Sequence, residues 1–238
     1  MGKRLSSIVL ALACMPFQVV AAQPPVAAGP TKSFELIDPA TVDPDRLVPP
    51  PPARGSSTEA IELDQVRKIV AAATPERMAQ ARWDDEHEDP SIFDDAMGRR
   101  LEDLPATWAL LRTIQHETDL AISMAKTHFA RVRPWAIDPT LPNCDAGKDK
   151  KTVGSYPSGH SGLGYALGWA LAQLAPEKAG AVLTRAREYA YSRVICGVHF
   201  PSDTEASHVI GTLIAARLFA DPRLAARISA ARRELSAA

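Results

Sequence analysis

The sequence predicts an all-α fold, a compact helical bundle preceded by an extended proline-rich N-terminal arm. From Ser57 onward, apolar residues recur near the helical period of 3.6 residues, and the alternation typical of strands is nearly absent. Residues 23–56 are instead rich in proline and end in four consecutive prolines at 49–52, which lack the amide donors that helices and sheets need. We therefore expect residues 57–238 to form the helical domain. The arm is expected either to wrap this domain or to link it to the N-terminus.

Start and stop signals give the order of the helices. Thr74-Pro75 is typical of a cap followed by proline at the first helical position. A long helix is expected through residues 108–129, ending before Pro134 because proline disfavours helix at the residue before it. Residues 135–157 predict a loop, and loops of this length in compact domains are often functional. Further helices are expected over residues 158–174, from Pro176 to near Gly197, over 203–219, and from Asp221-Pro222 onward.

The first 22 residues have the pattern of an export signal. Lys3 and Arg4 form a positive start, residues 7–13 a short apolar core, and residues 20–22 a small-residue cleavage site. The core is shorter than the roughly 20 residues that span a bilayer. We therefore expect a signal peptide over residues 1–22. A lipid-attachment box ending at Cys14 and a buried N-terminal helix are the alternatives.

Composition excludes few classes of protein. The net charge is -1, and no basic stretch with interleaved aromatic residues suggests a nucleic-acid surface. No apolar run has the length of a membrane span. We accordingly expect neither a specific nucleic-acid partner nor a membrane span.

Two clusters of candidate site residues point to an anion. Lys126 and Arg133 lie seven residues apart, about two helical turns, so both cations project from one face. Ser158, Gly159 and His160 begin an expected helix, where free backbone amides form an anion site and glycine lets a ligand approach the backbone. Each pattern alone is more often a solvated face or a turn, and the prediction depends on their conjunction.

A third cluster supplies the reactive groups. Arg193 adds a cation, and His199 and Asp203 lie four residues apart, a spacing at which the carboxylate can reach the imidazole. An imidazole oriented by a carboxylate can attack phosphorus, and a second histidine, His160, can protonate the leaving alkoxide. Phosphoryl transfer depends mostly on positioning and electrostatics, so three fixed cations predict a reaction that uses no metal and no cofactor.

The three clusters together resemble the motif of the type 2 phosphatidic acid phosphatase (PAP2) superfamily. Within it, the chain is similar to the class A bacterial non-specific acid phosphatases. The similarity extends to Leu47-Val48 with its following prolines, to residues 154–160 (GSYPSGH), and to residues 192–197 (SRVICG). It implies a periplasmic, self-associating, all-α enzyme that hydrolyses many small phosphomonoesters at acidic pH. It also implies active-site roles for Lys126, Arg133, Ser158, Gly159, His160, Arg193, His199 and Asp203.

The chain departs from the family pattern at two places. Ser161 stands where the motif usually has threonine, which keeps the hydroxyl. Phe200-Pro201 follows His199 where the family more often has Trp-Gln, and this change bears on substrate preference more than on the reaction class.

Three alternatives stay open at this stage. A vanadium-dependent haloperoxidase shares the superfamily's pocket but is usually a longer chain. A phosphate-binding module without turnover would need neither His160 nor His199. A membrane lipid phosphatase would need spanning helices.

Cys144 and Cys196 remain after removal of the signal, and an even pair in an exported chain is compatible with one disulfide. If folding brings Arg133 and Arg193 to one phosphate, the two cysteines that follow them come close together as well. We expect the disulfide, with two buried free thiols as the alternative.

Overall fold

The computed structural model describes residues 2, 33–144 and 151–237. The chain divides into two units, Met1–Thr31 and Lys32–Ala238, and the description below concerns the second. The predicted signal peptide over residues 1–22 lies outside the described residues, Gly2 apart, as does the first part of the arm.

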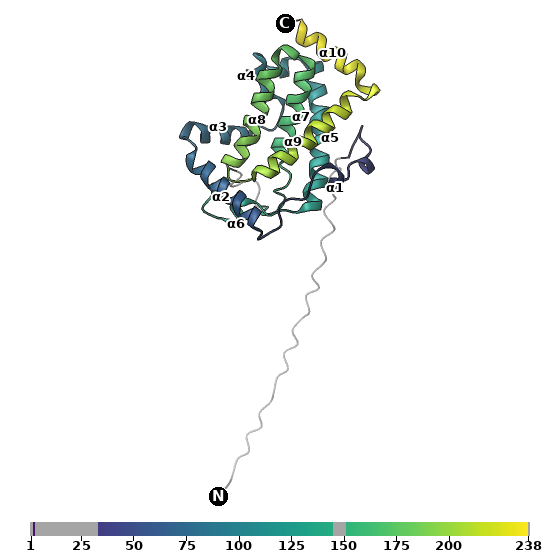
Figure 1. Ribbon diagram of the computed structural model, residues 1–238. Helices are drawn as coiled ribbons and strands as arrows, with labels where there is room; N and C mark the ends of the chain where they lie inside the picture. Colours follow the sequence, from purple (N-terminus) through teal and green to yellow (C-terminus); the bar gives the residue numbers. More distant parts are fainter. Residues whose placement is uncertain (1, 3–32, 145–150, 238) are drawn as a thin grey trace. The chain divides into compact units, whose positions relative to one another are not determined.

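Helices make up the second unit, as predicted (Figure 1). Among its described residues no strand forms, and Val132 and Val153 make an isolated antiparallel bridge. Three of the described helices have only four residues: α1 (Pro44–Leu47), α4 (Asp94–Met97) and α6 (Pro134–Ile137). The longer helices are α2 (Ser57–Ala72), α3 (Pro75–Glu86), α5 (Pro105–Phe129), α7 (Gly159–Leu174), α8 (Ala179–Ile195), α9 (Pro201–Phe219) and α10 (Ala225–Ser236).

Helix α7 is the centre of the bundle and packs against α5, α8 and α9. Figure 1 shows it between α5 and α8. Eleven of its 16 residues are buried, so it carries almost no polar face. Small residues allow this close packing: a Cβ atom on Gly211 of α9 would lie 2.5 Å from the Gly162 carbonyl oxygen of α7. The N-terminus of α7 is therefore held firmly where three other helices end or begin.

Local signals fix the helix boundaries close to their predicted positions. Thr74 caps α3 by accepting a hydrogen bond from the Arg77 amide, as the sequence predicts. Helix α5 ends at Ala130, which takes the left-handed conformation with φ 45°. After α8, Gly197 has φ 67° and lies so close to Pro142 that a Cβ would approach the proline carbonyl oxygen to 2.4 Å.

Two boundaries differ from the prediction. Helix α6 occupies the start of the predicted loop 135–157, because Pro134 serves as the first residue of a helix and not only as the stop of the preceding one. Helix α9 begins at Pro201, two residues before the predicted start, for the same reason.

The described part of the arm wraps the domain. Its polyproline residues 49–52 form no helix or strand, but Asp38-Pro39 and Asp43-Pro44 start short helical turns within the stretch that the sequence predicts to be extended. The buried carboxylate of Glu117 accepts hydrogen bonds from the amides of residues 35, 36 and 37 at 2.7–3.1 Å. Tyr156 donates a hydrogen bond of 2.6 Å to the Pro49 carbonyl.

Candidate active site

The three predicted clusters converge at one end of the bundle, where the helices deliver them from different directions. The last turn of α5 carries Lys126, and the last turn of α8 carries Arg193. Arg133 precedes α6, and Ser158 caps α7, which Gly159 and His160 begin. His199 precedes α9, and Asp203 lies in its first turn.

The surroundings of His199 fix its tautomer. The ring is buried, and Nδ1 lies 2.7 Å from the Ser155 carbonyl oxygen and 3.3 Å from Asp203 Oδ2. Both partners accept hydrogen bonds, so Nδ1 carries the proton. Nε2 lies 3.2 Å from the Arg133 guanidinium, which donates and cannot accept. Nε2 therefore has its lone pair on the side of the cations.

Asp203 is held by more groups than the sequence suggests. It is fully buried, and one oxygen accepts a 2.7 Å bond from Arg131. The other oxygen accepts bonds from the Ser155 hydroxyl at 2.5 Å and from the Phe200 amide at 2.8 Å. Its contact with His199 is longer than the Ser155 carbonyl contact. Orientation of the imidazole is thus shared between Asp203, the predicted partner, and the Ser155 carbonyl, which the sequence did not indicate.

Lys126 lies among charges of its own sign. Its Nζ donates a 2.6 Å bond to the Gly154 carbonyl. Burial, and then the Arg133 guanidinium, lower the pKa of Lys126 from its ordinary 10.5 to about 7. An incoming phosphate dianion would reverse this effect, because it favours the charged ammonium.

The other two cations are buried guanidinium groups. Arg133 is 8% exposed and also donates to the Val198 carbonyl at 3.2 Å. Arg193 is 1% exposed and pairs with Asp85 of α3 at 2.5 Å. Three positive side chains with limited access to solvent form a strong site for a phosphoryl group.

The start of α7 lies beside the three cations, but not all of its polar groups are directed at an anion. The Ser158 hydroxyl caps the helix and accepts bonds from the Ser161 amide at 3.3 Å and the Ser161 hydroxyl at 2.9 Å. The Ser158 amide donates to the Asp203 carbonyl at 3.2 Å, so this amide is directed away from an anion. Gly159 lies beside Lys126, whose Cε would be 3.9 Å from a Cβ at this glycine.

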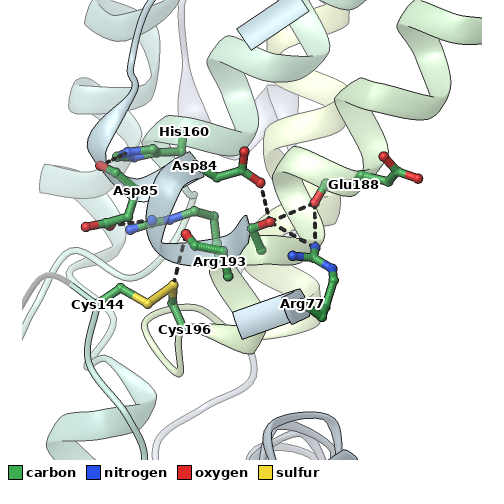
Figure 2. The surroundings of a disulfide bond; sticks show 10 residues. Arg77, Asp84, Asp85, Cys144, His160, Glu188, Arg193 and Cys196 are labelled. Carbon is green, nitrogen blue, oxygen red and sulfur yellow. Dashed lines mark hydrogen bonds and ion pairs between the residues drawn. A yellow bond between two sulfur atoms is a disulfide. The ribbon is translucent and has the colours of Figure 1, made fainter. Parts of the chain in front are cut away.

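His160 contacts the backbone of Asp85, as Figure 2 shows, and the carboxylate of Glu88. Its Nε2 is 3.3 Å from the Asp85 carbonyl oxygen, and its Nδ1 is 3.4 Å from Glu88 Oε1. The ring of Tyr189 stacks beside it, with centroids 5.8 Å apart. Because Asp85 also binds Arg193, this residue couples the second histidine to the cation cluster.

Comparison with known proteins agrees with this arrangement. The PAP2 superfamily model matches residues 107–226, which contain all three clusters. The chain belongs to the PAP2 superfamily. It is 31% identical to a non-specific acid phosphatase of Providencia stuartii over 98% of both chains. A non-specific acid phosphatase of Salmonella typhimurium is 30% identical over 79% of this chain and 78% of its own. An acid phosphatase of Zymomonas mobilis is 32% identical over 82% and 76%, respectively.

A disulfide joins Cys144 and Cys196 in this PAP2 protein, with Cα atoms 5.2 Å apart. Figure 2 shows it beside Arg193. The bond ties the segment after α6 to the end of α8, three residues from both Arg193 and His199. The two cysteines are 52 residues apart in the sequence, so the bond closes a long loop and restricts the unfolded chain.

Sequence reasoning missed the residues that support the site. Arg131, buried against Phe200, bridges Asp203 to Glu62 of α2 at 2.7 Å each. Asp84 is fully buried and pairs with Arg185 of α8 at 2.5 Å, which holds α3 where Asp85 reaches Arg193. Arg131 was detectable as a third cation between Lys126 and Arg133. The carboxylates of Glu62, Asp84 and Asp85 come from α2 and α3, far in the sequence from the arginines that they bind, so no local spacing of residues predicts them.

Two further properties bear on the class of site. Over the part of the chain that is described, no three histidine, cysteine or acidic residues gather in a way that could hold a metal ion. None of the described helices is both long and apolar enough to cross a membrane.

Proposed function

We propose that this PAP2 protein hydrolyses phosphomonoesters through a phosphohistidine formed on His199. The observation that carries the proposal is the set of groups that surround the two ring nitrogens of His199. The proton on Nδ1 is directed at Ser155 and Asp203, which leaves the lone pair of Nε2 beside Arg133. The similarity to acid phosphatases supports the same reaction class.

The chemistry balances with the residues present. His199 Nε2 attacks phosphorus, the bond to the leaving oxygen breaks, and His160 gives that oxygen a proton. In the second step His160 takes a proton from water, the resulting hydroxide attacks phosphorus, and the P–N bond breaks. Lys126, Arg133 and Arg193 stabilise the charge on the equatorial oxygens in both steps.

Rapid-quench trapping with labelled substrate tests the intermediate. We expect label on His199, none in His199→Ala, and unchanged labelling in His208→Ala, an exposed histidine of α9. His160→Ala should still become labelled by dinitrophenyl phosphate, whose leaving group needs no proton. Label on any other residue would overturn the assignment.

We also propose that hydrolysis proceeds without a metal, because three side-chain cations already surround the phosphoryl position. Activity should survive EDTA, and vanadate should inhibit as a mimic of the five-coordinate state. Loss of activity on chelation that Mg²⁺ or Zn²⁺ restores would refute this part.

Residence in the periplasm and self-association are proposals of the same kind. The export pattern of residues 1–22 and a disulfide suited to an oxidising compartment support the first. Cell fractionation with N-terminal sequencing should find a mature chain beginning at Gln23. Light scattering should give a mass above the monomer.

A further inference from the structure

The carboxylate of Glu88 lies beside His160 in the connection after α3, and the mechanism above does not use it. Its side chain is 50% exposed, and Oε1 lies 3.4 Å from His160 Nδ1. The same oxygen would be 3.8 Å from a Cβ atom at Gly159, the first residue of α7. A negative charge therefore stands at the edge of a site built to bind an anion.

The structure holds Glu88 in this place. The buried amide of Gln115 on α5 donates a 2.8 Å hydrogen bond to the Glu88 carbonyl oxygen, and Arg112 in turn donates to the Gln115 oxygen at 2.8 Å. The carboxylate also acts electrostatically on two neighbours: it opposes the fall that burial causes in the pKa of Lys126, and it adds to the rise that burial causes in the pKa of Tyr189. Glu88 thus belongs to the electrostatic environment of the site although no motif includes it.

The two nitrogens of His160 have different roles in this geometry. Nε2 faces the Asp85 carbonyl oxygen, which accepts, so a proton on Nε2 is held by the backbone. Nδ1 faces the Glu88 carboxylate, which also accepts, so only the charged imidazolium can donate to both neighbours at once. Nδ1 is on the side of the half-exposed Glu88 side chain, whereas Nε2 is on the side of backbone, so we take Nδ1 as the nitrogen that gives its proton to the leaving oxygen, which puts the leaving group next to Glu88.

We propose that Glu88 determines substrate preference at this site by the charge of the leaving group. Its carboxylate attracts a leaving group that carries a cation, repels one that carries an anion, and favours the protonated form of His160. The proposal rests on the proposed phosphohistidine chemistry. The charged and ionisable groups around His160 that enter the balance are Glu88, Asp85, Lys126, Arg193 and Tyr189.

Three substrates with leaving groups of two carbons test the preference at pH 5.5: 2-aminoethyl phosphate, 2-hydroxyethyl phosphate and phosphoglycolate. We expect kcat/KM to fall in that order, by about threefold to tenfold at each step. Glu88→Gln should bring the three values within about twofold of one another, and Glu88→Lys should reverse the order. Glu86→Gln, which removes an exposed carboxylate at the end of α3, is the matched control and should keep the wild-type order.

A second measurement isolates His160. The alkaline limb of kcat should move to lower pH in Glu88→Gln for the alkyl phosphates and stay in place for dinitrophenyl phosphate, which needs no proton. Equal ratios in wild type and Glu88→Gln would overturn the preference, and an unmoved limb would overturn the action on His160. If wild type cleaves none of the substrates, the proposed function itself fails. If wild type cleaves the substrates but Glu88→Gln leaves the kcat/KM ratios unchanged, only the proposed role of Glu88 is refuted.

Discussion

Lys126→Met should make the protein more stable at acidic pH while it removes most of the activity. The ammonium is charged below about pH 7 in the folded protein, whereas the unfolded chain keeps it charged up to about pH 10.5. Between these values the unfolded state binds more protons, so the free energy of unfolding rises with pH. Below pH 7 both states are charged, and the full penalty of holding the charge beside Arg133 is present.

The size of the effect follows from the same difference. A fall from 10.5 to about 7 corresponds to a penalty of about 5 kcal/mol at most. Methionine is of similar length but loses the charged hydrogen bond to the Gly154 carbonyl, which costs about 1–3 kcal/mol. We therefore expect the free energy of unfolding of the variant to exceed that of wild type by about 2–4 kcal/mol at pH 5.5, which is the relieved charge penalty minus the lost hydrogen bond.

Urea unfolding at pH 5.5 and pH 9, with the disulfide intact, measures this gain. Lys68→Met is the matched control, because this exposed lysine pairs with Asp64 on the surface of α2 and should change stability by less than about 0.5 kcal/mol. Inorganic phosphate should stabilise wild type more than Lys126→Met. A midpoint for Lys126→Met equal to or below that of wild type at pH 5.5 would refute the reasoning.

The other predictions concern the pH profile, the His199–Asp203 pair, the hydrogen bonds between Glu117 and the arm, and the packing of α7 against α9. In wild type, kcat/KM should decline as pH rises past about 7, because the free enzyme loses the charge on Lys126, and Lys126→Arg should move that decline to higher pH; an unmoved profile contradicts it. Asp203→Asn should lower kcat by about 100-fold or more in steady-state assays with little change in phosphate inhibition, and unchanged kcat would be the contrary result. Glu117→Gln should destabilise the protein by about 1–3 kcal/mol in urea and expose the arm to proteases, whereas wild-type cleavage rates would contradict a role of Glu117 in holding the arm. Gly211→Ala should cost about 1–3 kcal/mol by thermal unfolding because its Cβ meets the Gly162 carbonyl, and a neutral effect would show that α7 and α9 can separate.

Local signals in the sequence were enough to predict most of the helices. Thr74 before Pro75 and Ser158 before Gly159 are caps whose hydrogen bonds lie within three residues, so no tertiary information is needed to read them. Proline was harder to interpret, because it both ends one helix and begins another. That ambiguity placed residues 135–137 in a loop and set the start of α9 two residues late.

The same distinction applies to the site. Lys126, Arg133, His199 and Asp203 are spaced along the chain as the chemistry requires, and the structure brings them together. Their supporting groups are contributed by the tertiary fold. The Ser155 carbonyl that accepts from His199 is backbone, which carries no residue signature.

Carboxylates from distant helices were also beyond prediction. Glu62 and Asp85 reach the site from α2 and α3, 69 and 108 residues away from the arginines that they bind. A buried arginine requires a partner, and that rule predicts that such acids exist without saying which residues they are.

The three hydrogen bonds between the arm and the Glu117 carboxylate place an unusual constraint on how the arm can evolve. The carboxylate recognises the three backbone amides of residues 35–37, so substitutions that alter those side chains leave its hydrogen bonds intact. Proline is the exception, since it has no amide hydrogen. The arm is otherwise rich in proline, yet these three positions can accept any residue except proline. The sequence accordingly has no proline between Pro30 and Pro39.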